Sequence, residues 1–184
     1  NRQTEVRLIR LFVGIPMPAD IRMRLSLMAS GLPGAHWTRE EYYHLTLRYI
    51  GEVDQGIADD IDAMLGHVNV EPFDTTLSGI GYFGKAKSAR AVWAGIARND
   101  TLIRLQHKIE IALQHMGLPA EERKYAPHVT LARLRGTPAR RLEAYVANHG
   151  TFATGPFQVN GFTLFSSFLS SSGAIYTPEV QYEL

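Results

Sequence analysis

Two short segments of the sequence share one pattern: residues 44–47 read His-Leu-Thr-Leu, and residues 128–131 read His-Val-Thr-Leu. Side chains along a β-strand point alternately to its two faces, so residues i and i+2 share a face. Each segment can therefore bury its two aliphatic side chains in a core and present its His and Thr together on the other face. We expect each segment to be a strand that carries one His-Thr pair.

Both segments lie at matching places in a longer internal repeat. In each half, a strand-like run ending in Gly-Ile precedes a helical pattern that stops at Gly-Leu-Pro. The motif strand, a second helical pattern and a Pro-Phe that opens an extended segment follow. The motif His and the Pro-Phe are equally spaced in the two halves, since 72 − 44 = 28 and 156 − 128 = 28. The corresponding ranges are 8–15 and 91–96 for the first strands, 18–30 and 100–116 for the first helices, 55–68 and 138–149 for the second helices, and 73–83 and 157–165 for the extended segments. Two β-rich halves that resemble each other by chance would not be expected to share this order.

This order predicts an α+β fold in a single domain, residues 1–184, with two lobes related by a pseudo-twofold axis. We expect each lobe to be a mostly antiparallel sheet with two helices, formed by repeats of about residues 5–84 and 88–184, with a last strand near 174–184. An active-site groove between the lobes would receive one His-Thr pair from each. Asp100 is the predicted N-cap of its helix, and Thr137-Pro138 reads as a cap followed by a first-turn proline.

The composition is that of an ordinary globular protein, with 45% hydrophobic and 20% charged residues in 184. No apolar run is long enough to span a membrane, so we expect no membrane partner. The sequence has no cysteine, and its first residues, Asn-Arg-Gln-Thr-Glu, lack a signal-peptide pattern; both observations favour a cytoplasmic location.

A net charge of +1 argues against binding nucleic acid by charge alone. A local basic groove remains an alternative, because several cations cluster around the motifs: Arg39, Arg48, Arg123, Lys124, Arg133 and Arg135. We expect a monomer, because the repeat already supplies within one chain what a homodimer supplies between two.

Two imidazoles facing one another suit acid-base chemistry on a phosphodiester. Imidazole titrates near pH 6.5, so one His can accept a proton while the other donates one. The two Thr hydroxyls can donate hydrogen bonds to phosphoryl oxygens. For a single His-x-Thr, a surface or core histidine is the better explanation, but the duplication reverses that judgement. A metal site is the competing reading. It needs three or more ligands, and no Asp or Glu lies in either motif strand before Glu52. We therefore expect no metal and no other cofactor.

Residues 44–53 and 125–133, with their trailing Gly-Glu and preceding Pro, resemble the two motifs of the two-histidine (2H) phosphoesterase superfamily. Residues 12–16 and 92–95 also resemble family segments, and the flanks favour its bacterial and archaeal branch of RNA 2′,3′-cyclic phosphodiesterases and 2′-5′ RNA ligases. The sequence departs from the family at Ala126, where an Arg is often present. The resemblance implies hydrolysis of RNA or nucleoside 2′,3′-cyclic phosphates to 2′-phosphates without metal or ATP, with reversible 2′-5′ ligation as the reverse chemistry. RNA with cyclic phosphate ends, or cyclic nucleotides, would be the partner.

The same resemblance implies that His44 is the proton donor to the leaving 3′ oxygen and that His128 is the proton acceptor that activates water. Thr46 and Thr130 would hold the phosphoryl oxygens. The sequence alone leaves open which histidine is the acid, because the two lobes are so similar.

Arg133 is the best further candidate for a phosphate ligand. It lies five residues after His128, so strict alternation would put it on the wrong face, and either a β-bulge or the end of the strand must bring it round. Without the resemblance, an ordinary exposed Arg is an equally good explanation. Arg48 shares the parity of His44 and Thr46 and is a candidate for groove contact. Tyr125 is a candidate for stacking on a base, although core packing is the alternative for any one Tyr. Trp37 and Trp93 are expected in the core. The five remaining histidines are interpreted as ordinary loop or helix residues: His36, His67, His107, His115 and His149.

Two other functions stay open at this point. The same machinery could act on another cyclic phosphate, such as one on ADP-ribose, or on 2′-5′-linked oligonucleotides. Alternatively, the protein could be a non-catalytic module that binds RNA 3′ ends. The intact His and Thr at both positions argue against the second alternative.

Overall fold

The two motif histidines each begin a central strand, β3 (His44–Asp54) and β7 (His128–Leu134). The computed structural model describes residues 5–184. The expectation that the first residues form no signal peptide concerns positions that lie mostly outside this range. In both strands the two aliphatic residues of the motif are buried while the His and Thr are only half-buried. The alternation predicted from the sequence is therefore present at both motifs.

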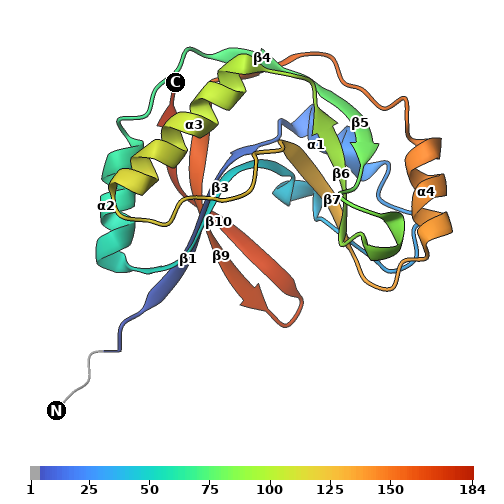
Figure 1. The fold of residues 1–184 in the computed structure, drawn as a ribbon, viewed down its shortest axis with the longest axis horizontal. Helices are drawn as coiled ribbons and strands as arrows, with labels where there is room; N and C mark the ends of the chain where they lie inside the picture. The colour runs from blue at the N-terminus through green and yellow to red at the C-terminus, as the bar shows by residue number, and fades with distance from the viewer. Residues whose placement is uncertain (1–4) are drawn as a thin grey trace.

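The strands form one curled sheet in the order β10-β9-β1-β3-β7-β6-β5, with β2 beside β7, and every pairing is antiparallel (Figure 1). Two short strands, β4 and β8, pair separately. The remaining strands are β1 (Leu8–Pro16), β2 (Ala35–Trp37), β4 (Phe73–Thr75), β5 (Leu77–Gly81), β6 (Ala91–Ile96), β8 (Phe157–Val159), β9 (Gly161–Ser170) and β10 (Gly173–Glu183). The sheet is thus continuous, whereas the sequence suggested a separate sheet in each lobe.

All four predicted helices are present: α1 (Ala19–Ser26), α2 (Gln55–Leu65), α3 (Asp100–His115) and α4 (Ala139–Asn148). Two capping predictions are wrong. Asn99, not Asp100, caps α3 by accepting a hydrogen bond from the Leu102 backbone N–H. The Thr137 hydroxyl donates to the Pro33 carbonyl rather than capping α4. At α3 the neighbouring Asn99 side chain accepts the capping hydrogen bond instead of Asp100. At α4 the Thr137 hydroxyl is already engaged by a carbonyl that is distant in sequence.

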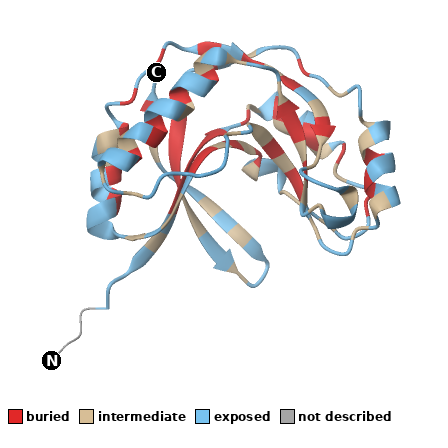
Figure 2. Cartoon of the chain, in the orientation of Figure 1, coloured by how far each residue is buried: buried red, intermediate tan, exposed pale blue. Residues whose placement is uncertain are grey.

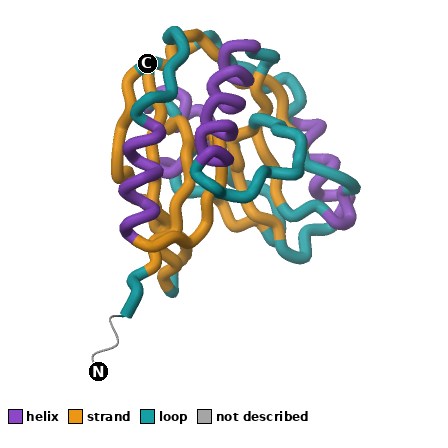
Figure 3. The backbone as a smooth tube through the Cα atoms, turned by 60° about the vertical axis from the view of Figure 1, so that its left-hand side comes forward, coloured by secondary structure: helices purple, strands orange, loops and turns teal. Residues whose placement is uncertain are grey.

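The two lobes do not correspond to the two sequence repeats. β9 and β10, from the second repeat, extend the β1–β3 side of the sheet, and β5, from the first repeat, extends the β7–β6 side. The helices exchange in the same way: α3 packs beside α2 and against β3, as Figure 3 shows from a second direction. On the other side, the Tyr145 hydroxyl of α4 donates to the Met28 carbonyl just after α1. The expected repeats of residues 5–84 and 88–184 therefore describe the sequence, and each lobe draws elements from both.

The core lies between the helices and the sheet (Figure 2). Its members are the aliphatic faces of β1, β3 and β7 and the inward stripes of the helices, such as Ile61 and Leu65 of α2 and Leu105 and Ile109 of α3. Because one face of the sheet is covered in this way, the His-Thr pairs are left on the other face. Within residues 5–184, none of the helices has the length and apolarity needed to cross a membrane.

Candidate active site

The four motif side chains lie on one face of adjacent strands. β3 and β7 are antiparallel, and Leu45 pairs with Val129. This register puts His44 opposite Thr130 and Thr46 opposite His128, all pointing away from the buried Leu45 and Val129. Diagonal neighbours across such a pair lie about 7–8 Å apart, a span suited to one phosphoryl group between two imidazoles. The structure therefore brings together the four residues that the sequence singled out.

Both imidazoles are held in the same orientation by backbone carbonyls. Nδ1 of His44 lies 2.7 Å from the Tyr42 carbonyl oxygen, and Nδ1 of His128 lies 2.7 Å from the Ala126 carbonyl oxygen. A carbonyl only accepts, so each Nδ1 donates and each Nε2 is left free to exchange a proton. Because Ala126 contributes its backbone, its departure from the family pattern leaves this contact in place.

The Nε2 atom of His44 already has one hydroxyl partner. It lies 3.0 Å from Oγ1 of Thr46. In the neutral imidazole, with Nδ1 protonated, Nε2 accepts this hydrogen bond from the hydroxyl; in the imidazolium, Nε2 donates. The Thr hydroxyl can therefore follow a change in the protonation of His44 without moving.

An aromatic cage surrounds His44. Its ring centroid lies 5.0 Å from that of Phe12, 5.5 Å from that of Tyr176 and 6.0 Å from that of Phe165. Burial among these rings lowers the pKa of His44; the hydrogen bond to the Tyr42 carbonyl opposes this change, and the nearby charge of His128 adds to it.

Aromatic rings also flank His128, and the sequence interpretation missed them. The Phe83 ring meets His128 edge-on at 5.0 Å, and the Trp93 ring lies 5.9 Å away. Trp93 was expected in the core but is only half-buried. It pairs with Thr130 and so lies on the face of the sheet that carries His44, Thr46, His128 and Thr130, which we call the catalytic face. A signal for it exists in the repeat, because residues 93–96 (Trp-Ala-Gly-Ile) match residues 12–15 (Phe-Val-Gly-Ile). Phe12 and Trp93 thus occupy equivalent places beside the two histidines.

A β-bulge follows each motif and reverses the alternation of side chains. Along β7 the pairing with β6 shifts between Thr130 and Ala132, so Leu131 is the extra residue. Arg133 consequently lies on the catalytic face and is exposed, and the β-bulge, rather than the end of the strand, brings it there. The exposed arginine is free to reach an anion beside His128.

The matching bulge in β3 corrects the prediction for Arg48. The pairing with β1 shifts at Leu47, so Arg48 turns to the helix-covered face, where it is only 8% exposed. Its guanidinium forms an ion pair with Glu110 of α3 and also donates to the carbonyls of Tyr49 and Pro119. Arg48 therefore does not line the groove. The next residue, Tyr49, is exposed and points to the face that carries the His-Thr pairs.

Glu110 is the centre of this buried polar network. Burial would raise the pKa of Glu110, but hydrogen bonds from Arg48, Gln114 and the Glu121 backbone N–H outweigh it and lower the pKa to about 2. The carboxylate stays ionised and holds α3, β3 and the segment that leads to the second motif.

Tyr125 lies at the site but uses its hydroxyl within the protein. The hydroxyl donates to the Thr46 backbone carbonyl over 2.9 Å, and burial raises the pKa of Tyr125. The side chain thus joins the segment before the second motif to the first motif strand. A stacking role for its ring stays a prediction.

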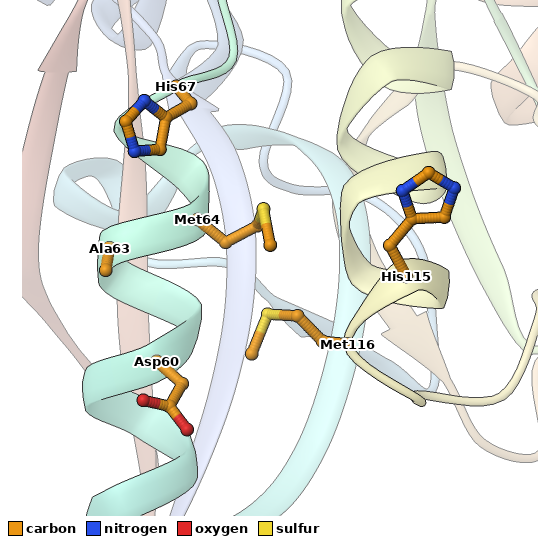
Figure 4. A pocket seen from close by; sticks show the side chains of 6 residues that line it. All are labelled: Asp60, Ala63, Met64, His67, His115 and Met116. Carbon is orange, nitrogen blue, oxygen red and sulfur yellow. The ribbon is translucent and has the colours of Figure 1, made fainter.

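The described residues contain no group of three or more His, Asp or Glu side chains arranged to hold a metal ion. Two cavities lie away from the histidine pair. One, of about 440 Å³, separates α2 from α3 (Figure 4), with His67 and His115 on its opposite walls and the side chains of Met64 and Met116 between them. The other, of about 730 Å³, lies beside β8 and the start of β9.

Comparisons with known proteins agree with this fold along most of the chain. The model of a family described as the 2′-5′ RNA ligase superfamily matches residues 23–167. A protein from Aeropyrum pernix, named RNA 2′,3′-cyclic phosphodiesterase, is 35% identical over 159 residues, which are 84% of this chain and 89% of the relative. A protein of the same name from Thermotoga maritima is 34% identical over 182 residues, 95% of this chain and 94% of the relative.

Solved structures share the fold. A protein from Thermus thermophilus superposes with a TM-score of 0.79 at 25% identity, covering 95% of this chain and 97% of that one. LigT from Escherichia coli, solved in complex with 3′-AMP, gives a TM-score of 0.79 at 24% identity, covering 97% of this chain and 99% of that one.

Proposed function

Because the chain belongs to the 2′-5′ RNA ligase superfamily, we propose that it is an enzyme that hydrolyses RNA 2′,3′-cyclic phosphates to 2′-phosphates. The observation that carries this proposal is the Leu45–Val129 register, which gathers two His-Thr pairs on one open face of the sheet. Relatives named RNA 2′,3′-cyclic phosphodiesterase support the substrate class. We further propose that the protein works as a monomer in the cytoplasm and that it needs neither metal nor ATP.

The proposed reaction is a single displacement at phosphorus. His128 Nε2 takes a proton from water as the water oxygen attacks, and the bond between phosphorus and the 3′ oxygen breaks. His44 Nε2 gives its proton to the leaving 3′ oxygen, and the product carries a 2′-phosphate and a 3′-hydroxyl. Thr46, Thr130 and Arg133 donate hydrogen bonds to the non-bridging oxygens, which carry the negative charge. The Nδ1 contacts to Tyr42 and Ala126 support proton transfer at Nε2 of both rings, because each backbone carbonyl engages Nδ1.

Substrate binding helps His44 act as the acid. Burial lowers the pKa of His44 in the free protein, so the proton is held weakly there. An anionic phosphate placed against the imidazole favours the protonated form and raises the pKa again. The proton then resides on His44 when the substrate is bound and leaves readily as the 3′ oxygen departs.

The same geometry supports the same displacement with another nucleophile. If the 5′-hydroxyl of a second RNA replaces water, its oxygen attacks phosphorus, the 3′ oxygen leaves with the proton from His44, and a 2′-5′ linkage forms. We therefore propose reversible 2′-5′ ligation as a second reaction of this site.

The proposal is tested by product analysis on a short RNA that ends in a 2′,3′-cyclic phosphate, with EDTA present. We expect conversion to a 2′-phosphate, identified by phosphorus NMR against 2′- and 3′-phosphate standards. A panel with an ADP-ribose cyclic phosphate and a 2′-5′-linked oligonucleotide separates the alternative substrates. Formation of a 3′-phosphate, or tight RNA binding without turnover, would overturn the proposed function.

A further inference from the structure

One rim of the catalytic face carries several exposed basic side chains. Three segments meet there because β2, β7 and β6 pair: residues 29–39, 83–99 and 125–142. None of them contains an Asp or a Glu, although the whole chain carries 18 acidic residues against 19 Lys and Arg. The concentration of positive charge is therefore local and does not reflect the near-neutral composition. We call five of the residues on this side the basic rim: His36, Lys85, Lys87, Arg133 and Arg135.

The rim begins at the candidate phosphate ligand and leads away from the histidines. Arg133 of β7 pairs with His36 of β2 and with Ala91 of β6, so the His36 and Arg133 side chains are neighbours on the catalytic face. Arg135 lies two residues further along, about 7 Å at the rise of a strand, and its backbone N–H donates to the Gly34 carbonyl beside β2. Both arginines and His36 are exposed.

The two lysines lie on the connection between β5 and β6, whose 3₁₀ helix contacts α4. This connection carries Phe83 against His128 and then turns through a short 3₁₀ helix, η2 (Ala86–Ser88). Lys85 precedes this helix, Lys87 is its second residue, and both are exposed. Among the described residues, no carboxylate lies within ion-pairing distance of Lys85, Lys87, Arg133 or Arg135.

The opposite rim differs although the fold repeats itself. The position in β3 equivalent to Arg133, five residues after the motif His, is Tyr49. Further along the same strand come Glu52 and Asp54, and Glu52 neutralises Arg10 of β1 in an ion pair of 3.0 Å. A polyanion is therefore attracted to the His128 side of the site and not to the His44 side.

We propose that the basic rim binds the RNA strand that precedes the cyclic phosphate, so that the enzyme prefers an oligonucleotide end to a mononucleotide. This inference rests on the proposed function. An RNA that ends in a 2′,3′-cyclic phosphate continues only in the 5′ direction, so its next phosphodiesters leave the site on one side. His36 and Arg135 extend the line of donors that starts at Arg133, and the two lysines add charge beside it. Such contacts are independent of sequence and depend on salt.

The test compares two substrates: a 2′,3′-cyclic mononucleotide and a hexaribonucleotide that ends in a 2′,3′-cyclic phosphate. Arg135→Ala and the triple variant Lys85→Ala, Lys87→Ala, Arg135→Ala remove exposed side chains that play no part in the proposed chemistry. We expect kcat/KM for the hexaribonucleotide to fall about tenfold or more in the triple variant at low salt, with mononucleotide turnover unchanged. The slope of log kcat/KM against log salt should become shallower by about 0.7 for each phosphate that the variant no longer neutralises.

Arg98→Ala is the control for the loss of one arginine outside the basic rim. Arg98 lies beyond the other end of β6, where its exposed side chain pairs with Asp100 over 3.4 Å. This variant should leave both substrates unaffected. Equal loss on the two substrates, or no loss on the hexaribonucleotide in the triple variant, would overturn the proposal.

A binding measurement separates failure of this inference from failure of the proposed function. Fluorescence anisotropy with a labelled hexaribonucleotide that ends in a 3′-phosphate needs no turnover. If the wild-type protein turns over neither substrate, the proposed function fails. Weaker binding by the triple variant would still support the rim in that case, and unchanged binding would refute it.

Discussion

Arg48 and Glu110 form an ion pair on the helix-covered face of β3, only two residues after the catalytic-face Thr46. The β-bulge at Leu47 is the cause, because it turns the Arg48 side chain to the helix-covered face of the sheet. The pair joins the first motif strand to α3 and, through the Glu121 N–H, to the segment that approaches the second motif. It is a structural support for the site.

Replacing Arg48 should destabilise the protein strongly. Arg48→Met leaves the Glu110 carboxylate buried without its main partner, and breaking a buried pair in this way costs about 3–5 kcal/mol. The free energy of unfolding, measured by urea denaturation at pH 7, gives the value. The double variant Arg48→Met, Glu110→Leu is the control and should recover much of the loss. Equal stability of the wild type and Arg48→Met would contradict the account.

The same pair predicts an acid-dependent loss of stability. The folded-state pKa of Glu110 is about 2, below its ordinary value of 4.5, so its contribution is complete above pH 4.5 and is lost as pH falls toward 2. Glu110→Gln should show a smaller decrease in unfolding free energy over this interval than the wild type. A matching decrease in both proteins would show that other groups account for it.

His44 should titrate below its ordinary pKa of about 6.5, because burial in the aromatic cage disfavours the imidazolium. Histidine ring NMR signals followed against pH give the pKa. Tyr176→Ala opens the cage to water and should raise the pKa of His44 toward the ordinary value. Phe83→Ala, which removes a ring beside His128 instead, is the matched control and should leave the His44 titration unchanged. A His44 pKa at or above 6.5 in the wild type would refute this reading.

A change of leaving group distinguishes the acid from the base. In a cyclic phosphate analogue whose 3′ leaving atom is sulfur, the thiolate departs without protonation, because its conjugate acid is far stronger than an alcohol. His44→Ala should therefore lose much less activity on the sulfur analogue than on the natural substrate. His128→Ala should lose activity equally on both. The opposite pattern would exchange the two roles.

Much of the fold follows from periodicity. The alternating motifs gave β3 and β7, and the apolar stripes gave the four helices, because these patterns depend on local geometry. The exchange of strands and helices between lobes could not be predicted from the sequence. The residue pattern of β5 or β9 is the same whether the strand pairs within its own repeat or with the other repeat. Asn99 and Asp100 are both good caps, and only the backbone angle at the start of α3 decides between them.

The candidate site divides in the same way. His44, Thr46, His128 and Thr130 could be found because the duplication overrides the ordinary explanation of each. Arg48 could not be assigned from its parity, because one extra residue in a bulge reverses every later side chain. Arg133 was placed on the catalytic face by the same effect. Trp93 could not be placed beside His128 from its residue type, because an aromatic residue in a strand usually belongs to the core.

The most direct test of the central claim is the kcat/KM of the wild-type, His44→Ala and His128→Ala proteins on a 2′,3′-cyclic mononucleotide in the presence of EDTA. The account predicts that the wild type keeps its activity in EDTA and that each single variant loses roughly 10²–10⁴-fold, because each imidazole supplies one proton transfer. Wild-type kcat/KM in either variant, or complete loss of wild-type activity in EDTA, would contradict the account.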